Sequence, residues 1–181
     1  MDEARNPSET ADAYASALLR IASSEEDPNA ASDEMYKAAM GLSDHADLID
    51  TFTDVRIPDD RKRGILDDLL GAKASRTTVA AMNFVVAAGH ARQLGQIAGR
   101  LAELSAEAEG EVLAEVRVPS ELSPEQTERL KAALEQVTGK RIDVRVTIDS
   151  AVIGGVVAKV GDTVLDGSVQ HRFTELREQW G

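Results

Sequence analysis

The first part of the chain repeats apolar residues with the period of an α-helix. In residues 93–108, Leu94, Ile97 and Leu101 recur three or four positions apart, and polar residues occupy the other faces. This spacing predicts an amphipathic helix with one buried stripe. Asp27 followed by Pro28 predicts the start of another helix, because aspartate caps a helix and proline suits its first position. We therefore expect an all-helical N-terminal bundle of about six helices.

After Gly110 the apolar residues alternate with polar ones, which is the period of a half-buried strand. Residues 112–118 and 142–148 show this alternation. Between them, Ser123 and Gln126 have the spacing of a capping box and predict a helix. The remaining expected elements are strands at 152–160 and 163–165, joined by a turn at Gly161-Asp162, and a last helix at 168–180. The predicted order is β-α-β-β-β-α, with a mixed sheet.

Composition divides the chain at the same place. Alanine falls from 22 residues in 1–110 to 5 in 111–181, while valine rises from 4 to 12. Alanine favours helices and valine favours strands. The fold class is therefore predicted as α+β, with a helical bundle at residues 1–108 and a small α/β domain at 109–181.

Charge and cysteine usage restrict the partners. The net charge is −12, and the chain has no cysteine. An acidic chain lacks the clustered Lys and Arg that bind nucleic acid or anionic lipid, and disulfides or cysteine-bound metals are excluded. Residues 1–10 do not resemble a targeting segment, and no apolar run approaches the roughly 20 residues that span a bilayer. We expect a soluble protein whose partner is another protein or a small molecule.

Residues capable of catalysis are present but not grouped. His45, His90 and His171 are far apart, and none has the spacing of a metal-ligand motif. The pairs Asp59-Asp60 and Asp67-Asp68 are interpreted as solvated charges on one helix, the first pair favouring its positive end. We therefore expect no catalytic residue, no metal site and no cofactor.

Residues 75–89 carry two opposite apolar stripes instead of one. Either this is a central helix of the bundle, buried on both sides, or one stripe lines a groove that a partner fills. Helix 8–22 shows a similarly broad stripe. The two stripes of 75–89 are Val79, Met82 and Val86 on one side, and Ala80, Phe84 and Ala87 on the other.

The segment from residue 152 to residue 180 resembles a known family. Its glycine pair lies inside a strand pattern, which favours a β-bulge or a close approach of the backbone over a phosphate loop. The pattern as a whole resembles the C-terminal signature of the delta subunit of the F-type ATP synthase, the counterpart of the mitochondrial oligomycin-sensitivity-conferring protein. Chain length, Tyr14-Ala15 and Arg92 are also similar to that family, whereas Asp12-Ala13 replaces its usual basic residue and proline. The signature residues are Gly154, Gly155, Gly161, Asp162, Asp166, Ser168 and Val169.

The resemblance implies a non-catalytic stator subunit at the cytoplasmic face of the bacterial plasma membrane, one copy in a hetero-oligomeric complex. It implies that the bundle binds the N-terminal segment of an alpha subunit between its first and fifth helices. It also implies that the C-terminal domain binds the b subunit. An unrelated acidic adaptor and a small hydrolase are the alternatives.

The residues that would make these contacts follow from the same resemblance. Phe173, Leu176 and Trp180 are candidates for the stalk contact, or are core residues of the last helix. The candidate residues of the groove are Tyr14, Ala15, Leu18, Val79, Met82 and Val86.

Overall fold

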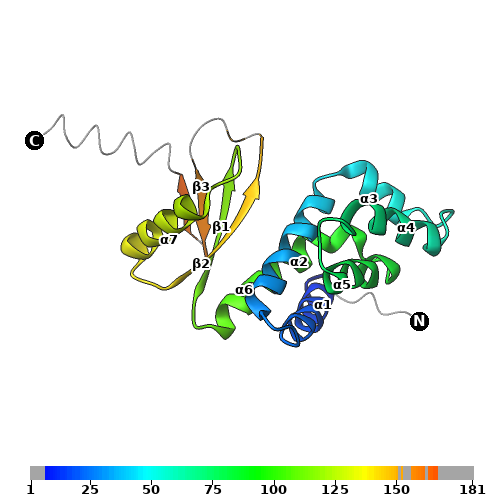
Figure 1. Cartoon of the computed structure of the whole chain (residues 1–181), viewed down its shortest axis with the longest axis horizontal. Helices are drawn as coiled ribbons and strands as arrows, with labels where there is room; N and C mark the ends of the chain where they lie inside the picture. Colours follow the sequence, from blue (N-terminus) through cyan, green and yellow to red (C-terminus); the bar gives the residue numbers. More distant parts are fainter. Residues whose placement is uncertain (1–6, 151, 153–155, 162, 167–181) are drawn as a thin grey trace, which may run out of the picture. The chain divides into compact units, whose positions relative to one another are not determined.

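A computed structural model describes residues 7–150, 152, 156–161 and 163–166 of the chain. Two compact units follow one another: residues 1–105, the helical unit, and residues 106–181, the sheet unit. The α+β fold class predicted from the sequence is confirmed (Figure 1). The helical unit contains α1 (Pro7–Ala22), α2 (Pro28–Ser43), α3 (Ala46–Thr53), α4 (Asp59–Leu70), α5 (Arg76–Ala87), the 3₁₀ turn η1 (Ala91–Gln93) and most of α6 (Leu94–Ala108).

The helices begin where the sequence supplies caps. The Asp27 carboxylate accepts a hydrogen bond from the backbone N–H of Ala30 at 3.0 Å, and Pro28 is the first residue of α2. In the same way, the Ser75 hydroxyl accepts the Thr78 N–H at 3.1 Å. Each cap satisfies a backbone donor that has no partner within the helix.

Helix α5 lies against α1, α2 and α4, and helix α2 lies against α1, α3 and α5, so these two helices form the centre of the unit. Their inner residues pack with large side chains from the surrounding helices, and burial of that apolar surface is the main stabilising contribution. The largest fully buried side chains of the unit are Tyr36, Phe52, Leu18, Met35, Leu66, Met82, Leu94, Ile97, Leu101 and Val85.

The sheet unit is built around a central strand. Strand β1 pairs in parallel with β2 and antiparallel with β3, and β3 pairs antiparallel with β4, in the order β2-β1-β3-β4. Helix α7 makes the crossover that a parallel pair requires. The bounds are β1 (Val112–Val118), α7 (Pro124–Thr138), β2 (Ile142–Ile148), β3 (Val157–Val160) and β4 (Thr163–Asp166).

Helix α7 has the predicted capping box. The Ser123 hydroxyl accepts the Gln126 N–H at 3.2 Å, and the Gln126 side chain accepts the Ser123 N–H at 2.8 Å. The helix ends at Gly139, whose φ of 67° lies in the left-handed region that favours glycine. Leu134 projects from α7 into the core of this unit, whose other buried residues are Ala114, Val116, Val118, Ile142, Ala158 and Val160.

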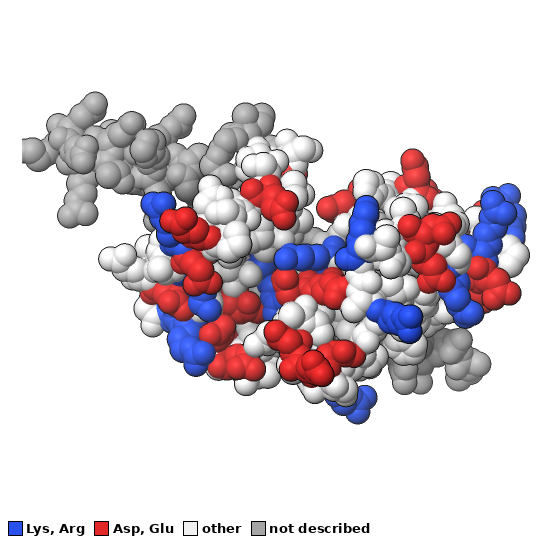
Figure 2. Space-filling model, in the orientation of Figure 1, with Lys and Arg blue, Asp and Glu red and all other residues white. Residues whose placement is uncertain are grey.

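Charged side chains alternate with these core residues along the strands. Arg145 pairs with Asp143 at 2.9 Å, and Lys159 pairs with Glu115 at 3.6 Å on the neighbouring strand. Because side chains alternate between the two faces of a sheet, these pairs lie on the face opposite this core cluster, where Arg145 is itself buried. Figure 2 shows acidic and basic side chains interspersed over the visible surface of both units.

Two sequence predictions fall partly outside the described residues. Gly161 has a φ of 55° at the β3–β4 turn, as the predicted hairpin requires of its first central residue. The helix expected at 168–180 lies outside the described part of the chain, and so do Gly154, Gly155, Asp162, Ser168 and Val169.

Candidate functional site

The structure separates the predicted groove residues into core and surface. Ala15 and Leu18 of α1 are buried, and so are Met82 and Val86 of α5. Side chains in these positions hold the bundle together and are not accessible to a partner unless the helices move apart. The two remaining predicted residues, Tyr14 and Val79, are half-buried.

Helix α5 turns the stripe of Val79 and Val86 away from α1. Asn83 shares that flank of the helix, and its side-chain amide donates to the Asp67 carboxylate of α4 at 3.4 Å. The opposite flank faces α1, because Phe84 contacts Tyr14 there. The apolar surface at α1 and α5 is therefore formed by the second stripe of residues 75–89.

Three rings meet at one end of this surface. The Tyr14 ring lies 5.3 Å from the Phe84 ring and 4.6 Å from the His90 ring, measured between centroids. Tilted rings at such distances attract each other through their quadrupoles. Phe84 is nevertheless 48% exposed, so the cluster presents an aromatic side chain to solvent.

A glycine places the third ring. Gly89 has a φ of 83° directly after α5, and the His90 N–H then donates to the Val85 carbonyl at 3.1 Å. This left-handed residue reverses the chain at the helix end, so that His90 packs back against Tyr14. Gly89 followed by His90 was the available sequence signal, but nothing in the spacing showed which helix the imidazole would reach.

The surface continues along α1 to a second end with different chemistry. Ile21 is 37% exposed, and one turn further the Glu25 carboxylate accepts a hydrogen bond from the Thr77 hydroxyl at 2.7 Å. Since Thr77 is near the start of α5 and Phe84 near its end, α1 and α5 run antiparallel. We call Tyr14, Ile21, Phe84 and His90 the α1/α5 surface, in which Ile21 and Phe84 are exposed and Tyr14 and His90 are half-buried.

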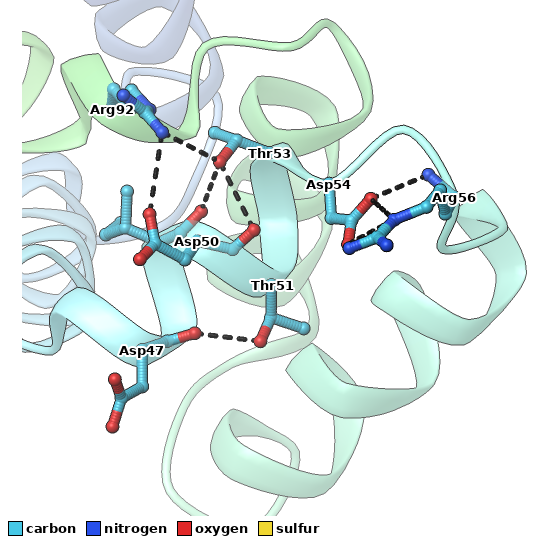
Figure 3. Close-up of polar contacts among 8 residues, drawn as sticks. Asp47, Asp50, Thr51, Thr53, Asp54, Arg56 and Arg92 are labelled. Carbon is cyan, nitrogen blue, oxygen red and sulfur yellow. Dashed lines mark hydrogen bonds and ion pairs between the residues drawn. The ribbon is translucent and has the colours of Figure 1, made fainter.

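Polar contacts of Arg92 and Arg56 lie at the C-terminal end of α3. Arg92 lies 3.5 Å from both the Asp50 carboxylate and the Thr53 hydroxyl, and so links η1 to α3 (Figure 3). Beyond α3, the Arg56 side chain donates to both oxygens of Asp54 (Figure 3). These hydrogen bonds, together with one from the Arg56 backbone N–H, lower the pKa of the Asp54 carboxyl from 3.8 to about 2.

Asp12 also has a structural role. Its carboxylate accepts a hydrogen bond from the Arg100 side chain at 2.8 Å, which joins α1 to α6, and Arg100 also pairs with Glu103. A basic side chain at position 12, which the resemblance described above leads us to expect, would face Arg100 instead of pairing with it.

The two carboxylate pairs that the sequence singled out lie on α4. Asp59 and Asp60 are exposed in the first turn of α4, and Asp67 and Asp68 are exposed two turns later. Within the described ranges, no group of three or more His, Asp or Glu side chains could hold a metal ion. None of the described helices has the length and apolar character to cross a membrane.

The predicted stalk residues fall in the undescribed part of the sequence. Phe173, Leu176 and Trp180 all follow residue 166, the last described position. Of the motif residues, Gly161 forms the β3–β4 turn and Asp166 ends β4. The α1/α5 surface is therefore the candidate site that the structure defines.

Comparisons with known proteins point to one family. The family described as ATP synthase delta (OSCP) subunit matches residues 10–180. "ATP synthase subunit delta" of Chlorobaculum parvum is 30% identical over 164 residues, which make up 91% of each chain. "ATP synthase subunit delta" of Nocardia farcinica is 32% identical over 163 residues.

Coverage differs among the relatives. The matched residues are 90% of this chain but 60% of the Nocardia protein, and 37% of "ATP synthase subunit b-delta" of Mycobacterium sp. (strain KMS), which is 31% identical. The chain thus spans less than two thirds of these two relatives.

A solved structure shares the fold. A chain of the Toxoplasma gondii mitochondrial ATP synthase hexamer superposes with a TM-score of 0.55 over 94% of this chain and 96% of that one. The two sequences are 21% identical, so this likeness concerns the fold alone.

Proposed function

Because the chain belongs to the ATP synthase delta (OSCP) subunit family, we propose that it is a non-catalytic subunit of the peripheral stalk of an F-type ATP synthase. In this role it fixes the catalytic head to the membrane sector. Rotor torque then drives ATP synthesis instead of spinning the head. The exposed apolar α1/α5 surface carries this proposal, because a structural subunit needs a docking surface and not a catalytic centre.

The helical unit is proposed to bind the N-terminal segment of the alpha subunit. Phe84 and Ile21 are large apolar side chains that remain exposed on adjacent helices, and Tyr14 lies between them. An amphipathic helix laid along two such helices buries its apolar stripe there. The docking residues of this proposal are therefore Tyr14, Ile21, Phe84 and His90, while Ala15, Leu18, Met82 and Val86 support them from the core.

The binding affinity that a stator subunit needs determines how large the contact must be. Nanomolar affinity corresponds to about 12 kcal/mol, whereas burying one large apolar side chain contributes about 1.5–3 kcal/mol. A few exposed residues are not enough alone. The proposed contact therefore extends over a standard interface, roughly 800 Å² on each partner, with the aromatic cluster as its central anchor.

The sheet unit is proposed to join the b subunit, and through it the cytoplasmic face of the plasma membrane. The name of the Mycobacterium relative pairs b with delta, which supports this partner. Removing residues 168–181 is expected to abolish binding of the b subunit and leave binding of the alpha segment intact. If one truncation removed both activities, the assignment of one partner to each unit would fail.

Two experiments test the proposed function. A tagged chain should retain the alpha and b subunits when it is isolated from solubilised membranes. Recovery with an unrelated set of proteins would favour the alternative, an acidic adaptor. The second experiment titrates a synthetic peptide of the same organism's alpha-subunit N-terminal segment into the purified chain by calorimetry.

Phe84→Ala should weaken binding of that peptide by about tenfold or more, since an aromatic anchor contributes 2 kcal/mol or more, roughly, at a hot spot. Val137→Ala is the matched control, because Val137 is 58% exposed on α7 of the sheet unit. Equal affinity of both variants and the parent chain would exclude the α1/α5 surface as the docking site.

A further inference from the structure

The α1/α5 surface has two unlike ends. At one end the rings of Tyr14, Phe84 and His90 form an apolar cluster. At the other end two carboxylates are held against the first turn of α5, those of Glu25 and Glu34. This difference restricts which side chains a partner helix can present when it docks along the surface, and at which positions.

Uncharged groups hold both carboxylates in place. Glu25 accepts a hydrogen bond from the Thr77 hydroxyl at 2.7 Å, and Glu34 accepts one from the Ser75 backbone N–H. These contacts fix the carboxylates and leave their negative charge in place. The positive end of the α5 dipole also favours acidic groups at this position.

The surrounding charges keep this end acidic. Glu26 and Asp27 follow Glu25 directly, and the Asp27 carboxylate is engaged by the N-terminus of α2. The neighbouring basic residues are Arg20 in the last turn of α1, Lys73 two residues before Ser75, and Arg76 at the start of α5. Lys37, one turn after Glu34 on α2, pairs with Asp33 at 2.7 Å. Acidic residues also predominate in the whole of residues 1–110, which contain 20 acidic and 11 basic residues.

The spacing between the two ends follows from helix geometry. Thr77, which binds Glu25, and Phe84, which contacts Tyr14, lie on one flank of α5 and are seven residues apart. Seven residues are two turns and span about 10 Å along the axis. A helix lying along α5 meets both ends with side chains that are also about seven residues apart.

We infer that the occupant of the α1/α5 surface is an amphipathic helix with an apolar anchor at the ring cluster and a Lys or Arg two turns away, against Glu25 and Glu34. This inference rests on the proposed function, which supplies the alpha-subunit segment as the occupant, and adds its charge and register. Opposite charges at that distance from the anchor fix the register of the helix and speed its association. An acidic or uncharged helix fits the apolar end equally well but gains nothing at the other.

The test removes the two charges and keeps the two hydrogen bonds. In the double variant Glu25→Gln, Glu34→Gln, the amide oxygens still accept from Thr77 and Ser75. The same alpha-subunit peptide should bind about fivefold more weakly at low salt, because exposed ion pairs contribute only modestly to affinity. The difference should shrink as ionic strength rises, since salt screens exposed charges.

The control variant, Glu121→Gln, Glu128→Gln, removes the same charge from exposed positions of the sheet unit. It should leave the affinity unchanged within about twofold, because its charges lie outside the docking surface. A loss of affinity as large as that of the Glu25, Glu34 variant would overturn the inference, since net charge alone would then explain the effect.

A double-mutant cycle tests the register. Each Lys or Arg of the peptide is replaced singly by Gln and titrated against the parent chain and the Glu25, Glu34 variant. Coupling confined to the basic residue about seven positions from the apolar anchor supports the inference, and coupling to none of them overturns it. If Phe84→Ala weakens binding but the charge variant does not, only the charged end is wrong; if neither does, the proposed docking site itself fails.

Discussion

The helical unit and the sheet unit differ in how their exposed apolar residues are distributed. In the helical unit Tyr36 and Phe52 are buried, but Tyr14 and Phe84 meet at the surface with Phe84 half exposed. Residues 106–166 of the sheet unit contain no aromatic residue. The exposed large apolar residues of its described part are dispersed over α7, β2 and β4, and they are Val137, Ile148 and Val164.

Charge shows the same contrast. On the sheet, Lys159 lies 3.6 Å from Glu115 of the adjacent strand, and Arg117 lies 3.8 Å from Asp149. Opposite charges thus pair within that unit. At the start of α5, by contrast, Glu25 and Glu34 are held by uncharged donors. The comparison teaches that the proposed docking site rests on a contiguous apolar surface bordered by carboxylates that uncharged donors hold, whereas the exposed apolar residues of the sheet unit are dispersed.

The largest effect should come from breaking the core of one unit. Phe52→Ala removes a fully buried ring and is expected to lower the free energy of unfolding of the helical unit by about 3–5 kcal/mol. Amide hydrogen exchange should then rise in α1 to α5 and stay protected in β1 and β2. Equal loss of protection in both units would show that they do not unfold independently.

A smaller pair of effects distinguishes the glycines of the two units. Gly139→Ala places a Cβ at a φ of 67° and should destabilise the sheet unit by about 1–2 kcal/mol. Gly64→Ala lies inside α4, where an added Cβ meets nothing within 4 Å, and should stabilise the helical unit by about 0.5–1 kcal/mol. Urea unfolding of each variant measures both changes. If both substitutions changed the free energy of unfolding in the same direction, this prediction would be contradicted.

The smallest effect concerns the exposed pair of Asp54 and Arg56. Arg56→Ala should return the pKa of Asp54 from about 2 toward 3.8, because the hydrogen bonds from Arg56 lower it. A depressed pKa in the folded state adds stability above pH 4, approximately, and this stability is lost as the pH falls toward 2. NMR titration of the Asp54 carboxyl measures the change. An unchanged pKa in the variant would assign the shift to another cause.

Local sequence signals predicted the elements well. Asp27-Pro28 and the capping box of Ser123 and Gln126 identified two helix starts, because caps act within a few residues of the chain. Alternation identified β1 and β2, whose residues Val112 and Ile142 stand opposite each other in the observed register. These features depend on neighbours in the chain, so the sequence contains them directly.

The candidate site was harder to predict because it depends on packing between distant segments. Both stripes of α5 are apolar, so periodicity did not reveal that Phe84 faces α1 while Val79 faces the side of α4. His90 joins the site only through the chain reversal at Gly89. Glu25 and Glu34 had no distinguishing pattern, since their contacts with α5 bridge 52 and 41 residues of sequence.

The central position of β1 has a mechanical consequence. Helix α6 ends at Ala108 and β1 begins at Val112, so a tensile load carried along α6 enters the sheet unit through β1. Strand β1 is hydrogen-bonded to β2 on one side and to β3 on the other. A pull along its axis therefore loads both ladders in shear, and their hydrogen bonds must break together instead of one after another. In the proposed stalk role, a load that passes from one unit to the other would therefore be resisted by both ladders at once.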